Sequence, residues 1–217
     1  SIAFPIRAAV LAIVQFFTGL AMWCLFVVGH DCGHGTFSNS KQLNRVIGEF
    51  AHSVVLCSPF VPWMLSHKEH HRHHNHTTKD YSHLWLVRED QGQILADFLP
   101  LRILFSVRWL MPIIAWPTYL YLGRPDGGHL VPLYGRLWED RSLSDRLHGY
   151  GSAAISIATM MTLGYTLGWD VLHVYVVPWI VYGFFLFTVT YLQHHDEETI
   201  IYGDQTWDFA RAAFETV

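Results

Sequence analysis

A long apolar run near the start of the chain limits the folds that this sequence can adopt. From Ala8 to Val28, Gln15 is the only strongly polar side chain in 21 residues. A helix of this length spans about 30 Å, which is the thickness of the hydrocarbon core of a bilayer. A buried core helix of this length and apolarity would be unusual, so we predict a transmembrane helix that ends at Gly29.

The composition and two later apolar runs agree with a membrane protein. The 217 residues are 51% hydrophobic and only 15% charged, which is too apolar for an ordinary soluble domain. The net charge is −4 without a polybasic block, so nothing indicates nucleic-acid binding. Apolar residues 150–167 and 171–191 flank a turn at 168–170 and predict a helical hairpin. We therefore predict an all-α fold, an integral membrane helical bundle.

Histidines are concentrated in one polar stretch. Seven of the 15 histidines lie between His67 and His83, and His67, His70 and His71 are spaced i, i+3 and i+4. On an α-helix these offsets place the three imidazoles on one face. Neutral imidazole is a good ligand for iron, zinc, copper or nickel, so the pattern predicts a metal site. The alternative is a solvated histidine-rich surface.

Two further histidine motifs stand at the ends of apolar runs. His30 and His34 follow the first run, and they share a helix face if the helix continues past Gly29. Gly33 and Gly35 instead predict that the helix frays here. The motif is weak alone but gains weight at the end of a membrane helix. His194 stands at the end of the last apolar run.

A shared site requires all these histidines on one side of the membrane. Apolar residues 46–65 separate the first two motifs and contain Pro59 and Pro62. A simple crossing would place the motifs on opposite sides, so we predict a segment that is re-entrant or lies along the interface. The alternative is a true second span with unrelated histidine clusters. Residues 103–122, rich in Trp, Tyr and Pro, also predict an interfacial segment.

With these motifs, the chain resembles the membrane fatty acid desaturases. Residues 25–38 are similar to the first histidine box of that family, and Pro62-Trp63 with residues 66–71, Asn75-His76 and Lys79-Asp80 are similar to the second. Residues 189–194 resemble the segment after the last membrane helix, and residues 207–209 the approach to a third box. The methyl-end group of delta-12 (omega-6) and omega-3 desaturases is the most similar. The third box, HxxHH, is absent, so we expect residues 1–217 to be a single desaturase domain, incomplete at both ends.

The resemblance implies a non-haem di-iron enzyme of the endoplasmic reticulum with its histidine boxes facing the cytosol. Such enzymes use O2 and two electrons, commonly from cytochrome b5, to introduce a cis double bond into an acyl lipid or acyl-CoA. It assigns six histidines as ligands of two iron ions: His30, His34, His67, His70, His71 and His194. Asp31, His74, Asn75 and His76 are expected to support these ligands rather than to bind metal. Six ligands are few for two irons, so we expect the fragment alone to be inactive.

Two other readings remain open. Histidine boxes do not separate a desaturase from an acyl hydroxylase, epoxygenase or acetylenase, because the outcome depends on how the substrate carbon sits over the metals. They also leave undetermined the double-bond position and the acyl carrier. A non-catalytic membrane zinc transporter or sensor is the other reading. That function expects polar ligands inside the membrane spans, whereas these histidines gather just outside the apolar runs.

Overall fold

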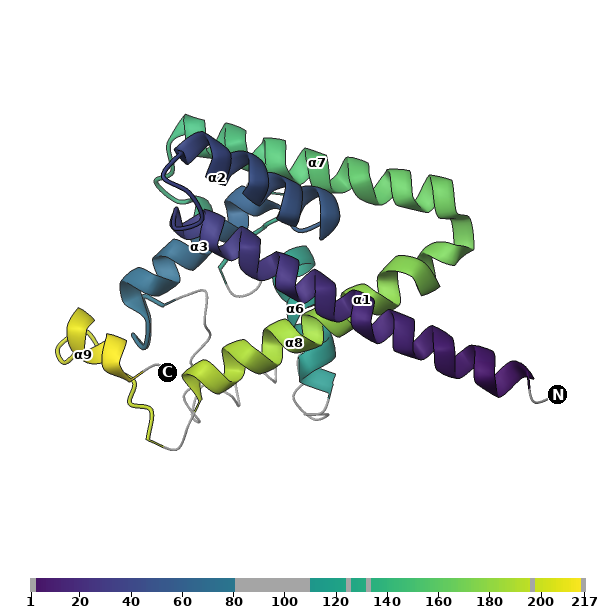
Figure 1. Cartoon of the computed structure of the whole chain (residues 1–217). Helices are drawn as coiled ribbons and strands as arrows, with labels where there is room; N and C mark the ends of the chain where they lie inside the picture. Colours follow the sequence, from purple (N-terminus) through teal and green to yellow (C-terminus); the bar gives the residue numbers. More distant parts are fainter. Residues whose placement is uncertain (1–2, 81–109, 124–125, 132–133, 196–197, 216–217) are drawn as a thin grey trace.

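The computed structural model describes residues 3–80, 110–123, 126–131, 134–195 and 198–215, and every regular element in them is a helix (Figure 1). In chain order these are α1 (Ala3–His34), α2 (Lys41–Gly48), the π-helix η1 (Glu49–Val55), α3 (Phe60–His73), α6 (Met111–Leu122), η3 (Arg136–Trp138), α7 (Leu143–Leu167), η4 (Gly168–Asp170), η5 (Leu172–Val176), α8 (Val177–His194) and α9 (Phe209–Phe214). The predicted all-α fold is confirmed. His83 and the first part of the expected interfacial segment lie outside the described residues.

The described part of the chain contains two helices that are long and apolar enough to cross a membrane. They are Phe4–His34 and Leu172–His194, and a bent pair of helices, Lys41–Val55 with Phe60–His73, makes a third candidate if it is counted as one span. The membrane helix predicted at 8–28 and the second arm of the hairpin are among them. The first arm forms α7, but its many small and hydroxyl residues lower its hydropathy. The span expected at 150–167 is therefore not among these candidates.

Helix α1 does not end at Gly29 as predicted but continues through 32 residues to His34. A Cβ atom at Gly29 would collide with the His52 ring, and one at Gly33 would lie 3.0 Å from Trp63. These glycines therefore allow neighbouring side chains to approach the helix closely. The helix ends only at Gly35, whose φ of 77° is left-handed.

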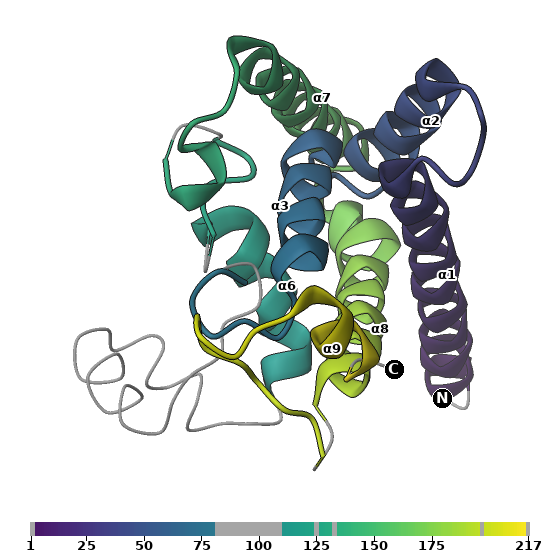
Figure 2. The ribbon, with the colours of Figure 1, turned by 90° about the vertical axis from the view of Figure 1, so that its left-hand side faces the viewer.

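Helices α1 and α8 cross each other, and in Figure 1 both run from right to left, toward the side that faces the viewer in Figure 2. At the crossing, a Cβ atom on Gly19 would lie only 2.5 Å from the Val181 Cβ, so glycine is needed for this approach. Before the crossing, Gln15 Nε2 of α1 donates to the carbonyl of His173 in η5 at 3.0 Å. Because both helices run toward the same side of the bundle, their last residues, both histidines, lie on that side.

Between η1 and α3 the chain makes a sharp reversal. The segment formed by α2 and η1 meets α3 at an angle of 111°. Pro59 is the N-cap of α3 and Pro62 lies in its first turn, where a missing N–H is tolerated, so the prolines begin this helix. His34 before the reversal and His67 after it have Nε2 atoms 3.1 Å apart. The segment therefore leaves and returns to the same end of the bundle, as expected for a re-entrant segment.

A carboxylate fastens this reversal. Glu49 accepts hydrogen bonds from the Ser152 hydroxyl of α7 and from the Ser53 hydroxyl, both at 2.6 Å. These hydroxyls accept in turn from the first backbone N–H groups of α3, those of Val61 at 3.2 Å and Phe60 at 2.9 Å. Such N–H groups have no partner within their own helix. Glu49 thus organises the N-terminal cap of α3 and joins it to α7.

An aromatic layer connects the helices next to the histidines. The Phe26 ring contacts Trp63 of α3, Trp116 of α6 and Tyr182 of α8, with ring centroids 5.2–5.9 Å apart. Trp116 comes from the segment expected at the membrane interface, yet it is only 7% exposed and belongs to the core. Trp63 also stacks on the His67 imidazole at 4.8 Å. The layer therefore separates the apolar bundle from the histidines.

We predict that Glu49→Gln destabilises the protein by about 1.5–3 kcal/mol, the usual worth of hydrogen bonds to a charged group. The substitution removes the charge, which also pairs with Arg45 at 3.0 Å, and one of the two oxygens that accept from the serine hydroxyls. Ser152 has a second acceptor in the His148 carbonyl at 3.2 Å. Thermal unfolding in detergent, followed by tryptophan fluorescence, measures the change. Thr159→Val is the matched control, because the Thr159 hydroxyl bonds only within its own helix, to Ile155 O at 3.0 Å. Equal unfolding temperatures for the two variants would contradict the role of Glu49.

Candidate metal centre

Three helices bring the predicted histidines together. The last two turns of α1 carry His30 and His34, the C-terminal half of α3 carries His67, His70 and His71, and α8 ends at His194. The common course of α1 and α8 toward one side and the reversal before α3 place all these residues at one end of the bundle. The structure divides the six imidazoles into a group of four and a group of two.

The group of four, here called the four-imidazole cluster, consists of His30, His34, His67 and His71. Its ligand nitrogens all lie within 4.8 Å of one another. The Nε2 atom of His34 is 3.2 Å from that of His30 and 3.1 Å from that of His67, and the latter is 3.0 Å from that of His71. Nitrogens bound at 2.0–2.1 Å to one metal lie about 3–4 Å apart, so the cluster fits a single metal ion.

The group of two, here called the second position, joins α3 to α8. His70 Nε2 lies 3.2 Å from His194 Nε2, although 124 residues separate them in the chain. The His70 ring is centred 6.1 Å from that of His67 and 5.6 Å from that of His71. The second position is therefore adjacent to the four-imidazole cluster, as in sites that hold two metals.

Carboxylates orient two of these rings. Asp80 accepts from His70 Nδ1 with its oxygens at 2.9 and 3.0 Å, and its side chain has no exposed surface. His30 Nδ1 lies 3.1 Å from the Asp31 carboxylate, which is 51% exposed. A carboxylate that accepts the Nδ1–H leaves Nε2 free to bind a metal, which is the usual arrangement of metal-binding histidines. Both rings point Nε2 toward their partners, which supports binding of a metal.

Asp80 is the residue that sequence reasoning missed. Asp31 was expected to support a ligand because it follows His30 directly, whereas Asp80 was only part of the resemblance to the second box. The available signal was weak: Asp80 is the first acid after His76. Its role became visible only from the fold of the intervening turn.

The remaining candidates lie at different distances from the imidazoles. His74 Nδ1 donates to the His71 carbonyl at 2.9 Å, so it supports the backbone of one residue of the four-imidazole cluster. Asn75 and His76 contact none of the six imidazoles in the described structure. Instead, the Asn75 carbonyl accepts from Tyr202 N at 2.8 Å, and a backbone bridge pairs His76 with Tyr202. These two residues bind the segment 198–215 to the end of α3.

Comparison of the sequence with known proteins identifies the family of this chain. The pattern of the family described as "Fatty acid desaturase" matches residues 7–215, nearly the whole chain. The chain belongs to the fatty acid desaturase family. The resemblance found in its histidine boxes is thereby confirmed.

Individual desaturases show the same relationship. The chain is 34% identical over 207 residues to the delta(12) fatty acid desaturase fat-2 of Caenorhabditis elegans, covering 92% of this chain and 52% of that protein. It is 35% identical over 211 residues to the omega-3 fatty acid desaturase fat-1 of the same organism, covering 94% and 49%. It is 33% identical over 204 residues to the acyl-lipid omega-3 desaturase (cytochrome b5), endoplasmic reticulum, of Arabidopsis thaliana, covering 92% and 51%. The chain spans about half the length of these curated relatives.

We predict that metal binding by the four-imidazole cluster of this desaturase chain weakens in acid. Each imidazole must be neutral to bind, so protons compete with the metal for the same nitrogens. Affinity is therefore greatest where all four rings are neutral, and it falls with decreasing pH by about tenfold per pH unit for each proton that the metal must displace. Titration with Co2+ from pH 7.5 down to the lowest pH at which the protein stays folded measures the trend. An affinity independent of pH would contradict coordination by imidazole.

We also predict that Asp80→Ala weakens metal binding at the second position by about 10–100-fold, the usual effect of losing the partner of a ligand. Asp31→Ala is the matched comparison and should cost less, because half of the Asp31 carboxylate is exposed and water can replace it. Equilibrium Co2+ binding to the two variants measures the difference. An equal or larger effect for Asp31→Ala would contradict this ranking.

Proposed function

We propose that the protein is a non-haem di-iron desaturase that removes two hydrogens from adjacent methylenes of a fatty acyl chain, with O2 and two electrons as co-substrates. The observation that carries the proposal is the adjacency of the four-imidazole cluster and the second position at the end of apolar helices. Membership of the family and the names of the delta-12 and omega-3 relatives support the same reaction.

The donor set favours iron. Iron held by nitrogen ligands supplies the oxidising power, drawn from O2, that an unactivated C–H bond requires, whereas zinc has no redox chemistry. The chain's own residues hold and orient the site. His70 and His30 are fixed by Asp80 and Asp31, and Trp63 stacks on His67 and helps to exclude water from that side. Two imidazoles are too few to hold a metal firmly, so further donors must complete the second position in the working enzyme.

The apolar bundle provides an environment for the hydrocarbon substrate. Side chains of α6, α7, η5 and α8 line a cavity of about 430 Å3, with Met160, Leu163, Val176 and Ile180 among them. We propose that this cavity accepts part of the apolar chain of an acyl lipid or acyl-CoA from the bilayer. We propose an endoplasmic reticulum location with the histidines facing the cytosol, and cytochrome b5 as electron donor. The name of the Arabidopsis relative gives the endoplasmic reticulum and cytochrome b5 for that protein.

The test is expression of the full-length protein in a yeast that lacks polyunsaturated fatty acids. We predict a new double bond at the delta-12 or omega-3 position, identified by mass spectrometry of the fatty acids. His70→Ala should abolish the product, because this imidazole helps to form the second position, while the apolar helices still insert in the membrane.

The control for this experiment is His148→Ala, which removes an exposed imidazole at the start of α7. It should leave the product unchanged. A hydroxylated or epoxidised fatty acid would show that the protein is an acyl hydroxylase or epoxygenase rather than a desaturase. Near-normal desaturation by His70→Ala would contradict the role of the second position.

A further inference from the structure

The turn after α3, residues 74–80, is largely buried although all its side chains are polar. Asn75 and His76 have no exposed surface, and Asp80 is 2% exposed. Asn75 adopts a left-handed φ of 57°, which reverses the chain at the end of the helix. The reversal carries Asp80 back toward α3, where its carboxylate accepts from His70 Nδ1. The position of this turn therefore determines whether Asp80 can reach His70.

His76 holds the turn from within. Its Nδ1 atom accepts from the backbone N–H groups of Thr78 at 3.2 Å and Lys79 at 3.1 Å. The His76 carbonyl lies 3.4 Å from Asp80 N and accepts its hydrogen bond. Because Nδ1 is an acceptor, the hydrogen of the neutral ring is on Nε2. Neither ring nitrogen is directed to the six imidazoles, so His76 does not act as a metal ligand in this structure.

A distant segment holds His76. Asp204 Oδ1 lies 3.3 Å from His76 Nε2 and 2.7 Å from Lys79 Nζ, so one carboxylate oxygen contacts both residues. Backbone hydrogen bonds join Tyr202 to both sides of His76: Tyr202 N donates to Asn75 O at 2.8 Å, and Thr77 N donates to Tyr202 O at 3.0 Å. The segment 198–215 therefore lies across the turn and fixes it by several independent contacts.

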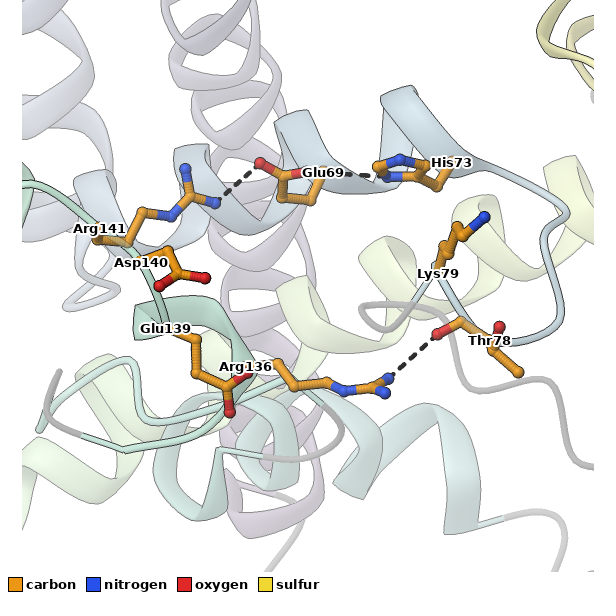
Figure 3. Close-up of a pocket in the computed structure, with 8 residues that line it drawn as sticks. All are labelled: Glu69, His73, Thr78, Lys79, Arg136, Glu139, Asp140 and Arg141. Carbon is orange, nitrogen blue, oxygen red and sulfur yellow. Dashed lines mark hydrogen bonds and ion pairs between the residues drawn. The ribbon is translucent and has the colours of Figure 1, made fainter. Parts of the chain in front are cut away.

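On the other side, the turn is tied to the chain before α7. Figure 3 shows the Arg136 guanidinium directed at the Thr78 carbonyl, to which it donates at 3.1 Å, while the Lys79 ammonium points away from Arg136. Arg141 likewise donates to Glu69 on α3 at 2.9 Å. Since Arg136 is exposed, its contact with Thr78 is a weaker restraint on the turn than the buried His76. The part-buried Arg141–Glu69 pair acts on α3 rather than on the turn.

We propose that His76 is a positioning residue of the second position: it fixes the turn that holds Asp80 against His70, and Asp204 holds His76 in turn. The inference rests on the proposed metal centre and adds two residues that act on it without touching a metal. The contacts run in one direction, from Asp204 to His76, through the backbone of the turn to Asp80, and from Asp80 to the His70 ring.

The charges of His76 and Asp204 agree with Asp204 holding His76. Burial, followed by the charge of Lys79, holds the pKa of His76 below its ordinary value, so the ring is neutral at pH 7. The hydrogen bond from Lys79 lowers the pKa of the Asp204 carboxyl, which therefore stays ionised. A neutral ring with its hydrogen on Nε2 accepts both backbone hydrogens at Nδ1 and places Nε2 3.3 Å from the carboxylate oxygen, where the attraction is electrostatic rather than a well-directed hydrogen bond.

The test is a double-mutant cycle on Co2+ binding by the full-length protein, with His76→Ala, Asp80→Ala and the double variant. His76→Ala should weaken the second position about tenfold, the lower end of the range for losing a partner of a ligand, and leave the four-imidazole cluster unchanged. If His76 acts through Asp80, the double variant should bind within about twofold of Asp80→Ala alone. The proposal would be overturned if the affinity losses of the two single variants multiply in the double variant. It would also be overturned if His76→Ala weakens the four-imidazole cluster as much as the second position, because equal losses indicate general unfolding.

Two further variants keep the test decisive. Asp204→Asn changes a residue that is 67% exposed, so it should fold even if His76→Ala does not. It should weaken only the second position, and by no more than His76→Ala does. His148→Ala should change neither position. If His70→Ala removes no bound Co2+ from the protein, the second position does not bind metal and the proposed function fails. If it does remove bound Co2+, but the affinity losses of His76→Ala and Asp80→Ala multiply in the double variant, only the role of His76 is contradicted.

Discussion

The reversal between η1 and α3 is the constraint on which the metal centre depends. A segment that crossed the bilayer would place His34 and His67 about 30 Å apart, whereas their Nε2 atoms are separated by 3.1 Å. A reversal within an apolar bundle leaves backbone N–H groups without partners, which is costly there. Glu49 removes this cost by directing two serine hydroxyls at the first turn of α3. The candidate metal centre therefore depends on Glu49, although this carboxylate does not belong to it.

The two metal positions are supported in different ways. The imidazoles of the four-imidazole cluster come only from α1 and α3, and they are packed against each other and against Trp63. The second position needs α8 for His194, the turn for Asp80 and the segment 198–215 for the turn. Each additional element is a further place at which the geometry can be lost. Metal ligands require accurate support from the surrounding residues, so the second position is the more sensitive of the two.

The sequence predicts what depends on local periodicity. The shared face of His67, His70 and His71 follows from the spacing within one helix. The end of α1 does not follow from local spacing. A glycine such as Gly29 can end a helix or can leave room for a neighbouring side chain, and here it leaves room for the distant His52 ring. The support of His70 is less predictable still. It depends on the left-handed Asn75, whose side chain contacts a carbonyl 137 residues later in the chain.

Sequence separation also orders the assembly of the site. The contact between His34 and His67 closes a loop of 33 residues, whereas that between His70 and His194 closes one of 124. The longer loop costs about 1 kcal/mol more in chain entropy, a modest penalty. The larger difference is in time, since domains form from the N-terminus during synthesis. The four-imidazole cluster can therefore form before α8 exists, and the second position forms on a partner that is already in place. The second position therefore forms only when the late segments, α8 and residues 198–215, have folded correctly.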